Sequence, residues 1–141
     1  MKIAFLHQPN DPYVTVRIKY FISIGYEVFS IVYEKDESQK IIKGLKIIYL
    51  KFNLFSKIPM LKRFIYANRI SKITSTNNIE ILHIVNALNS FYLYFSKAKV
   101  NVLEIEGSDV LKTPLDFPFI KYYYKLFFKY SDAFIQDSQI S

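Results

Sequence analysis

Two histidines are the first residues of this sequence that could do chemistry. His7 and His83 each lie at the end of an apolar run. Histidines from the ends of two strands could serve one cleft as acid, base or hydrogen-bonding groups. They are too few for a zinc site without carboxylate help, and no metal site is predicted. A histidine in an apolar strand is also often a hydrogen-bonded structural residue, so both interpretations stay open.

A group of carboxylates forms the second candidate. Glu104, Glu106 and Asp109 surround Gly107 after another apolar run. In the simpler interpretation this is a turn, in which Gly107 adopts an unusual backbone angle and a polar side chain caps nearby amides. In the chemical interpretation it is a cleft wall, where a carboxylate orients a ligand hydroxyl or acts as a base. The candidate catalytic residues are therefore His83, Glu106 and Asp109.

The elements that must position these residues follow from the hydrophobic pattern. Short apolar, β-branched runs predict strands at residues 2–8, 27–33, 45–50, 79–85, 100–105 and 133–136. Helical spacing predicts helices at 13–24, 60–75, 88–97 and 119–130, and residues 106–118 are expected to form a loop. This alternation predicts an α/β fold, a Rossmann-like, doubly wound, mainly parallel sheet with crossover helices.

The fold class predicts where a ligand would bind. Ligands of such sheets sit at the carboxyl ends of the strands, near the point where the strand order switches. The loops at residues 8–13, 85–89 and 106–114 are expected to line that crevice. The candidate substrate-binding residues are His7, Gln8, Asn10, Asn86, Gly107 and Ser108.

Composition limits the class of protein. The chain has 141 residues, 51% of them hydrophobic, with only 3 Gly and 5 Pro, which excludes an intrinsically disordered or fibrous chain. We expect one domain over residues 1–141. The absence of cysteine excludes disulfides and thiolate sites and fits a reducing cytoplasm. The first predicted loop contains no G-x-G-x-x-G pattern and the chain has no Walker loop, which argues against dinucleotide or nucleoside triphosphate binding in this domain.

The net charge of +7 raises the question of an anionic partner. No nucleic-acid-binding motif is present, so charge alone supports that class. Residues 57–72 alternate basic and apolar side chains, which would suit either a solvated helix face or contact with an anionic membrane surface. Residues 117–130 are also basic and aromatic, but aromatics all round the predicted helix favour burial. The candidate membrane-surface residues are Lys57, Lys62, Arg63, Arg69 and Lys72.

An ordered set of short motifs carries a family resemblance. They are GYEV at residues 25–28, GLKI at 44–47, EILH at 80–83, EGSDVL at 106–111 and SDAFIQDS at 131–138. Together they resemble the N-terminal, acceptor-side domain of GT-B glycosyltransferases of family 4. The resemblance covers essentially the whole chain.

The resemblance implies the acceptor-binding half of a retaining glycosyltransferase. A glycan or lipid-linked acceptor in cell-surface polysaccharide synthesis would bind here, at the cytoplasmic side or peripherally at the inner face of the membrane. The nucleotide sugar would bind a C-terminal domain that is absent from this chain, so this domain is expected to hold no cofactor of its own. The chain alone is expected not to turn over nucleotide sugar.

Three departures from the family pattern suggest an alternative function. Val85 stands where the family often has a second histidine, Glu106 replaces a histidine or tryptophan, and the first loop lacks glycine. These changes fit an altered acceptor or reduced activity. The alternative is a non-catalytic basic Rossmann-like module that binds a phosphorylated ligand or a partner protein.

Overall fold

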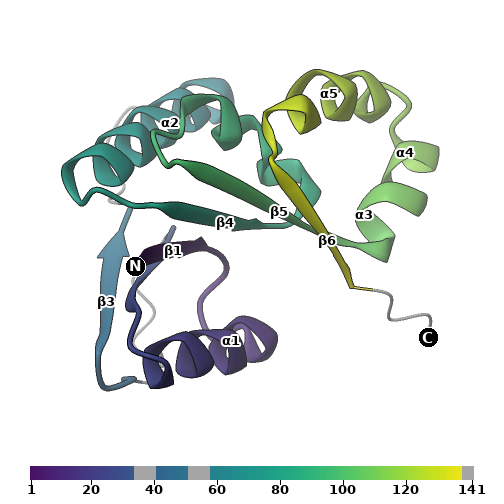
Figure 1. The fold of residues 1–141 in the computed structure, drawn as a ribbon. Helices are drawn as coiled ribbons and strands as arrows, with labels where there is room; N and C mark the ends of the chain where they lie inside the picture. The colour runs from purple at the N-terminus through teal and green to yellow at the C-terminus, as the bar shows by residue number, and fades with distance from the viewer. Residues whose placement is uncertain (34–40, 51–57, 138–141) are drawn as a thin grey trace.

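The architecture is a six-stranded sheet with helices on both faces (Figure 1). The computed structural model describes residues 1–33, 41–50 and 58–137. The strand order is β3-β2-β1-β4-β5-β6, and every neighbouring pair is parallel, which confirms the predicted Rossmann-like fold. The strands are β1 (Lys2–Leu6), β2 (Glu27–Val32), β3 (Leu45–Tyr49), β4 (Ile81–Val85), β5 (Val100–Glu106) and β6 (Ala133–Asp137).

The helices divide between the two faces of the sheet. Helix α1 lies on one face, while α2, η2 and α5 lie on the other (Figure 1). The α-helices are α1 (Pro12–Ser23), α2 (Pro59–Thr76), α3 (Gly107–Leu111), α4 (Thr113–Asp116) and α5 (Ile120–Phe127). The 3₁₀ helices are η2 (Ala87–Phe95) and η3 (Phe128–Tyr130).

Each face of the sheet has its own apolar core. In the larger core, side chains on one face of β1, β2, β4 and β5 pack against Tyr66, Ala67 and Ile70 of α2. In the smaller core, side chains on the opposite face of the sheet pack against Val14 and Ile18 of α1. Strands buried on both faces explain why the sequence shows continuous apolar runs rather than alternation.

Local signals in the sequence set the ends of α1 and α2. The Asp11 carboxylate accepts hydrogen bonds from the backbone N–H groups of Tyr13 (3.0 Å) and Val14 (3.2 Å), which caps α1. Gly25 follows the helix with a φ of +91°, the left-handed conformation that glycine adopts without strain. Pro59 begins α2, as its fixed φ favours.

Two expectations about the second half of the chain are wrong. Residues 106–118 are largely helical, because α3 starts directly at Gly107 and Pro114 stands in the first turn of α4. Gly107 does not adopt the expected positive φ, which among the described glycines occurs at Gly25 and Gly44. The short helix expected at 88–97 is confirmed, as a 3₁₀ helix at residues 87–95.

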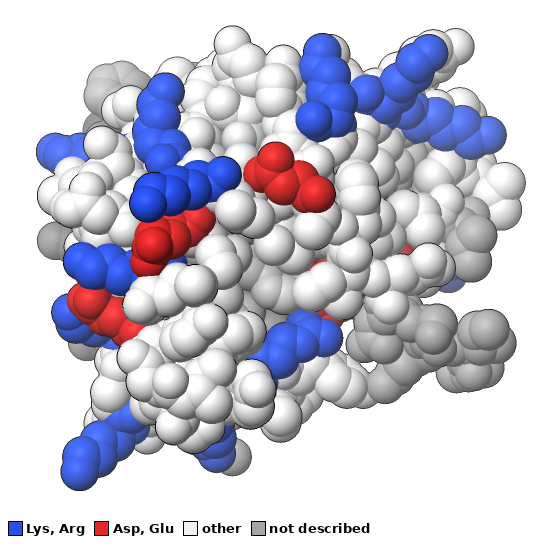
Figure 2. Space-filling model, in the orientation of Figure 1, with Lys and Arg blue, Asp and Glu red and all other residues white. Residues whose placement is uncertain are grey.

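The helix expected at residues 119–130 is confirmed in α5 and η3, but its aromatic side chains are not all buried. Tyr124 is buried, whereas Phe119 and Tyr122 are exposed. On the face of the molecule drawn in Figure 2, Lys and Arg side chains gather over α5. Part of this helix is therefore an outer surface rather than core.

We expect the α2 core contact to dominate stability. Ile70 is fully buried between α2 and the sheet, so Ile70→Ala should lower the free energy of unfolding by about 2–5 kcal/mol. Val16→Ala, at an exposed position of α1, should change it by less than about 0.5 kcal/mol. Urea unfolding followed by circular dichroism measures both, and equal losses would contradict this account of the core.

Candidate functional site

A pocket of about 260 Å³ opens at the carboxyl ends of β1, β4 and β5. The strand order places β1 beside β4, so the loops that follow these strands diverge at this point and leave a crevice between them. The loop after β1, the loop after β4, the end of β5 and one residue of α2 supply the lining. The lining residues are Gln8, Asp11, Arg63, Val85, Asn86, Leu88, Asn89 and Glu106.

The loop after β4 is held by its own polar side chains. Asn86 has a φ of +80°, a conformation in which Asn is enriched, and its side-chain oxygen accepts from the N–H of Leu88 (2.8 Å). The Asn89 amide donates to the carbonyl of Val85 (2.9 Å) and accepts from the Tyr33 hydroxyl (2.8 Å). These bonds fix the floor of the pocket.

The Asp109 carboxylate ties the exits of two strands together. It accepts hydrogen bonds from the backbone N–H of Ala87 (3.1 Å) after β4 and of Glu106 (3.3 Å) at the end of β5. The Tyr124 hydroxyl donates to the Asp109 carbonyl (2.9 Å). Asp109 is buried, so the structure gives this candidate a positioning contact, and its catalytic role stays a prediction.

His83 lies below the pocket in a buried ionic cluster. Its Nε2 is 2.8 Å from Oε2 of Glu104, and the Arg17 guanidinium of α1 donates to the same oxygen. The His83 ring also packs on Phe5, with ring centroids 5.0 Å apart. Burial opposes ionisation of Glu104, but the bonds from His83 and Arg17 outweigh it and lower the pKa of Glu104 to about 2. The cluster joins β4, β5 and α1 through one carboxylate.

His7 lies on the same face as His83 but makes different contacts. Its Nδ1 donates to the carbonyl of Gln8 (2.6 Å), and its Nε2 accepts from the Ser30 hydroxyl. Burial lowers the pKa of His7. His7 and Asn10 line a second pocket of about 230 Å³ against α1, so neither contributes to the pocket at the β1–β4 switch.

Arg63 connects α2 to the pocket. Its guanidinium donates to the Tyr123 hydroxyl (3.1 Å) and lies 5.8 Å from the Tyr123 ring centre. The Tyr123 hydroxyl in turn donates to the carbonyl of Leu88 (2.6 Å), within the loop that lines the pocket. The guanidinium is therefore held at the pocket wall by an aromatic side chain of α5.

The predicted residues thus fall into separate places. The structure brings Gln8, Asn86 and Glu106 together in one pocket, and Gly107 begins the helix that follows Glu106. The side chain of Ser108 lies outside the described residues, as does Lys57. Among the candidate membrane-surface residues, Lys72 is exposed, whereas Lys62, Arg63 and Arg69 are partly buried.

Sequence reasoning missed five residues of the pocket as ligand contacts, of which three are polar: Asp11, Arg63 and Asn89. Asp11 and Asn89 lie in loops that the strand pattern had already assigned to the crevice, so their polar side chains were a usable signal. Arg63 belongs to α2, which is distant in sequence from the loops that line the pocket. The contact between Arg63 of α2 and Tyr123 of α5 places its guanidinium at the pocket wall. It had been considered only as a surface charge.

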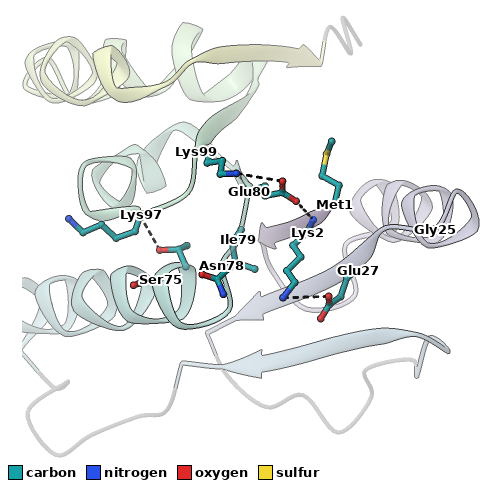
Figure 3. A pocket seen from close by; sticks show the side chains of 11 residues that line it. Met1, Lys2, Gly25, Glu27, Ser75, Asn78, Ile79, Glu80, Lys97 and Lys99 are labelled. Atoms are coloured by element: carbon teal, nitrogen blue, oxygen red, sulfur yellow. Dashed lines mark hydrogen bonds and ion pairs between the residues drawn. The ribbon is translucent and has the colours of Figure 1, made fainter.

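The largest of these pockets, about 670 Å³, lies at the opposite, amino-terminal edge of the sheet (Figure 3). Its charged groups pair with one another: Lys2 is 3.7 Å from Glu27, and Lys99 is 3.9 Å from Glu80. This edge is remote from the switch point, and its carboxylates are engaged by lysines. The pocket at the amino-terminal ends of the strands is therefore not the candidate site, and its residues serve below as control positions.

The described residues contain neither a metal-ligand cluster nor a membrane-spanning helix. Within residues 1–33, 41–50 and 58–137, no three or more His, Cys, Asp or Glu side chains are grouped as metal ligands. In the same part of the chain no helix is long and apolar enough to cross a bilayer.

Comparison with known families decides the assignment. Residues 2–138 match the family described as glycosyl transferase 4-like. The chain belongs to the glycosyl transferase 4-like family. This confirms the predicted resemblance to the N-terminal domain of a GT-B glycosyltransferase. A comparison with curated proteins gave no match.

Solved structures of another protein share the fold of this glycosyl transferase 4-like chain. It is similar to two structures of a sucrose-phosphate synthase from Thermosynechococcus elongatus, with TM-scores of 0.64 and 0.67 at 10% and 11% identity. The matches cover 99% and 95% of this chain, and 77% and 41% of the synthase chains. The chain therefore spans less than half of the longer synthase chain. At this identity, the likeness shows the shared fold of one GT-B half.

The buried cluster predicts a specific dependence of stability on pH. The folded pKa of Glu104 is about 2, below the usual value of about 4.3 in an unfolded chain. The folded state binds fewer protons between these values, so this stabilisation is present above about pH 5 and lost as the pH falls towards 2. Glu104→Gln should remove about 3 kcal/mol of this pH-dependent stability.

Urea unfolding at a series of pH values between 2 and 7 measures this difference. Asp116→Asn, at an exposed position of α4, should retain the wild-type slope. A Glu104→Gln variant with an unchanged slope would show that the cluster does not hold the charge as described.

Proposed function

We propose that the pocket at the β1–β4 switch binds the acceptor sugar of a glycosyl-transfer reaction. The observation that carries this proposal is the character of its lining. Side-chain amides, carboxylates and one guanidinium surround a small apolar floor in a pocket of about 260 Å³. Such a volume lies just below the usual range for drug-sized ligands and suits a single sugar ring.

The lining matches the chemistry of a polyhydroxylated ligand. Sugar hydroxyls both donate and accept hydrogen bonds, and the Gln8 amide can do the same in return. Glu106 offers an accepting carboxylate, and Arg63 offers donors from the opposite wall. Val85 and Leu88 provide apolar surface for the carbon-bound hydrogens of the ring.

The charge balance of the pocket favours a neutral acceptor over a phosphorylated one. Asp11 and Glu106 contribute two carboxylates, against the single guanidinium of Arg63. Two negative charges would repel a phosphate at this position. The lining therefore supports the transferase proposal more than the alternative of a phosphate-binding module.

The proposed reaction requires a second half that holds the donor. The nucleotide sugar supplies an activated anomeric carbon, to which an acceptor hydroxyl oxygen forms a bond as the nucleoside diphosphate leaves. The proton lost by that hydroxyl goes to a base. Glu106 lines the pocket and is exposed, which makes it our candidate for accepting the proton. A lipid-linked or cell-surface polysaccharide acceptor stays a prediction from the family resemblance.

Saturation-transfer NMR with the methyl glycosides of glucose, galactose, mannose and N-acetylglucosamine tests acceptor binding. At least one glycoside should receive saturation from the chain. Glu106→Gln should weaken that binding by about tenfold, since it replaces a charged acceptor by a neutral amide, and Gln8→Ala by about three- to tenfold, since it removes a hydrogen-bonding group. Both side chains are exposed, so neither change should disturb the fold.

The control variant is Lys97→Gln in the amino-edge pocket of Figure 3, which should leave glycoside binding unchanged. Inorganic phosphate serves as the competing probe. Tighter binding of phosphate than of any glycoside, or an equal loss in the Lys97→Gln variant, would contradict the proposal.

A further inference from the structure

The outer side of α4 and α5 exposes large apolar side chains. They come from α4, from the connection after it and from two positions one turn apart on α5. They are Leu115 (77% exposed), Phe117 (65%), Phe119 (85%), Tyr122 (77%) and Leu126 (52%). Water-facing aromatic residues grouped in this way mark an interaction site, because isolated exposed apolar residues are ordinary and clusters are not.

The same side carries a row of positive charge. Lys121 and Lys125 are exposed and one turn apart on α5, beside Tyr122 and Leu126, and Lys112 precedes α4. Residues 112–129 contain four lysines and one aspartate. Figure 2 shows the Lys and Arg side chains that gather over α5. We call these five apolar residues with Lys112, Lys121 and Lys125 the α4–α5 surface.

The inner side of α5 is firmly attached, so this exposure is a property of the fold. Tyr124 is buried and stacks on Phe128, with ring centroids 4.8 Å apart. Tyr123 bonds to Leu88 and accepts from Arg63. The helix therefore has one face committed to the domain and the opposite face available for a partner.

We propose that the α4–α5 surface binds an anionic lipid bilayer. A helix that lies in a membrane interface combines lysines, which meet lipid phosphates, with aromatic and leucine side chains, which enter the boundary of the acyl region. Protein interfaces are instead depleted in lysine near their apolar core. The interleaving of lysine with exposed aromatics thus favours lipid over a protein partner.

This assignment moves the membrane surface away from the segment that the sequence suggested. On α2, Lys62 lies over the Tyr66 ring (5.5 Å) and Arg63 bonds to Tyr123. These two charges are engaged within the domain, and both side chains are partly buried. Lys121 and Lys125 of α5 are instead exposed. Phe119 (85% exposed) and Tyr122 (77%) beside them are more exposed than Met60 (68%) and Phe64 (50%) of α2.

Sedimentation with vesicles tests the proposal on the whole chain. The chain should sediment with vesicles of phosphatidylcholine and phosphatidylglycerol at low salt, bind much less to pure phosphatidylcholine, and be released at high salt. Lys121→Gln with Lys125→Gln should lower the binding by about tenfold or more at low salt. Phe119→Ser with Tyr122→Ser should lower it by about tenfold at any salt concentration.

Matched controls come from the exposed side of α1, on the other face of the sheet. Lys19→Gln and Tyr20→Ser alter exposed residues of the same types and should leave vesicle binding unchanged. Lys72→Gln tests α2. Absence of binding to anionic vesicles, or a loss caused by Lys72→Gln but not by the α5 variants, would overturn the proposal.

A fluorescence experiment keeps the proposal testable if a double variant folds poorly. The chain contains no tryptophan, so Tyr122→Trp introduces a single reporter. Its emission should shift to the blue on addition of anionic vesicles and be quenched by brominated lipid, whereas Tyr20→Trp should do neither. If the emission of Tyr122→Trp does not respond, or if the surface instead dimerises the chain without lipid in sedimentation velocity, the lipid assignment is wrong.

Discussion

A single buried carboxylate joins three elements of the domain below its candidate site. One oxygen of Glu104 receives both the Arg17 guanidinium of α1 and the His83 imidazole of β4, so three elements distant in sequence meet at one atom. A charge buried in this way is tolerable only while both partners remain in place. Because Asp11 caps the N-terminus of α1, the same cluster also helps to position the wall of the pocket to which Asp11 belongs. This cluster therefore links part of the stability of the domain to the position of the site.

A second level of organisation lies in the loops above that cluster. The side chains of Asn86, Asn89 and Asp109 bond to backbone groups and hold the exits of β4 and β5 in fixed positions. The residues that face the pocket from the rim, Gln8 and Glu106, are exposed. Such a division would allow residues of the rim to change without disturbing the loops beneath them.

The sequence was most informative where burial is two-sided. The ends of the strands were predicted to within about two residues, because short apolar, β-branched runs are typical of strands buried on both faces of a sheet. Residues 106–118 were expected to form a loop, yet Pro114 stands in the first turn of α4, just as Pro59 begins α2. For Tyr122 and Tyr124, two residues apart, no periodic pattern tells which side faces the sheet. The pairs His83–Glu104 and Arg63–Tyr123 could not be predicted, because their members are distant in sequence and meet only through the packing of the elements that carry them.

The two edges of the sheet are protected unequally. At β3, Lys46 reaches across to Glu27 (2.5 Å) and covers the Phe29 ring, so a charge guards that edge. At β6, Phe134 and Ile135 are exposed, and no described strand pairs with its outer side. A strand edge of this kind can pair with a further strand, whether from the same chain or from another molecule, and mutual repulsion of positively charged chains opposes pairing between molecules. Added salt weakens that repulsion and also weakens attraction to anionic surfaces, so the two kinds of contact respond to salt in opposite directions.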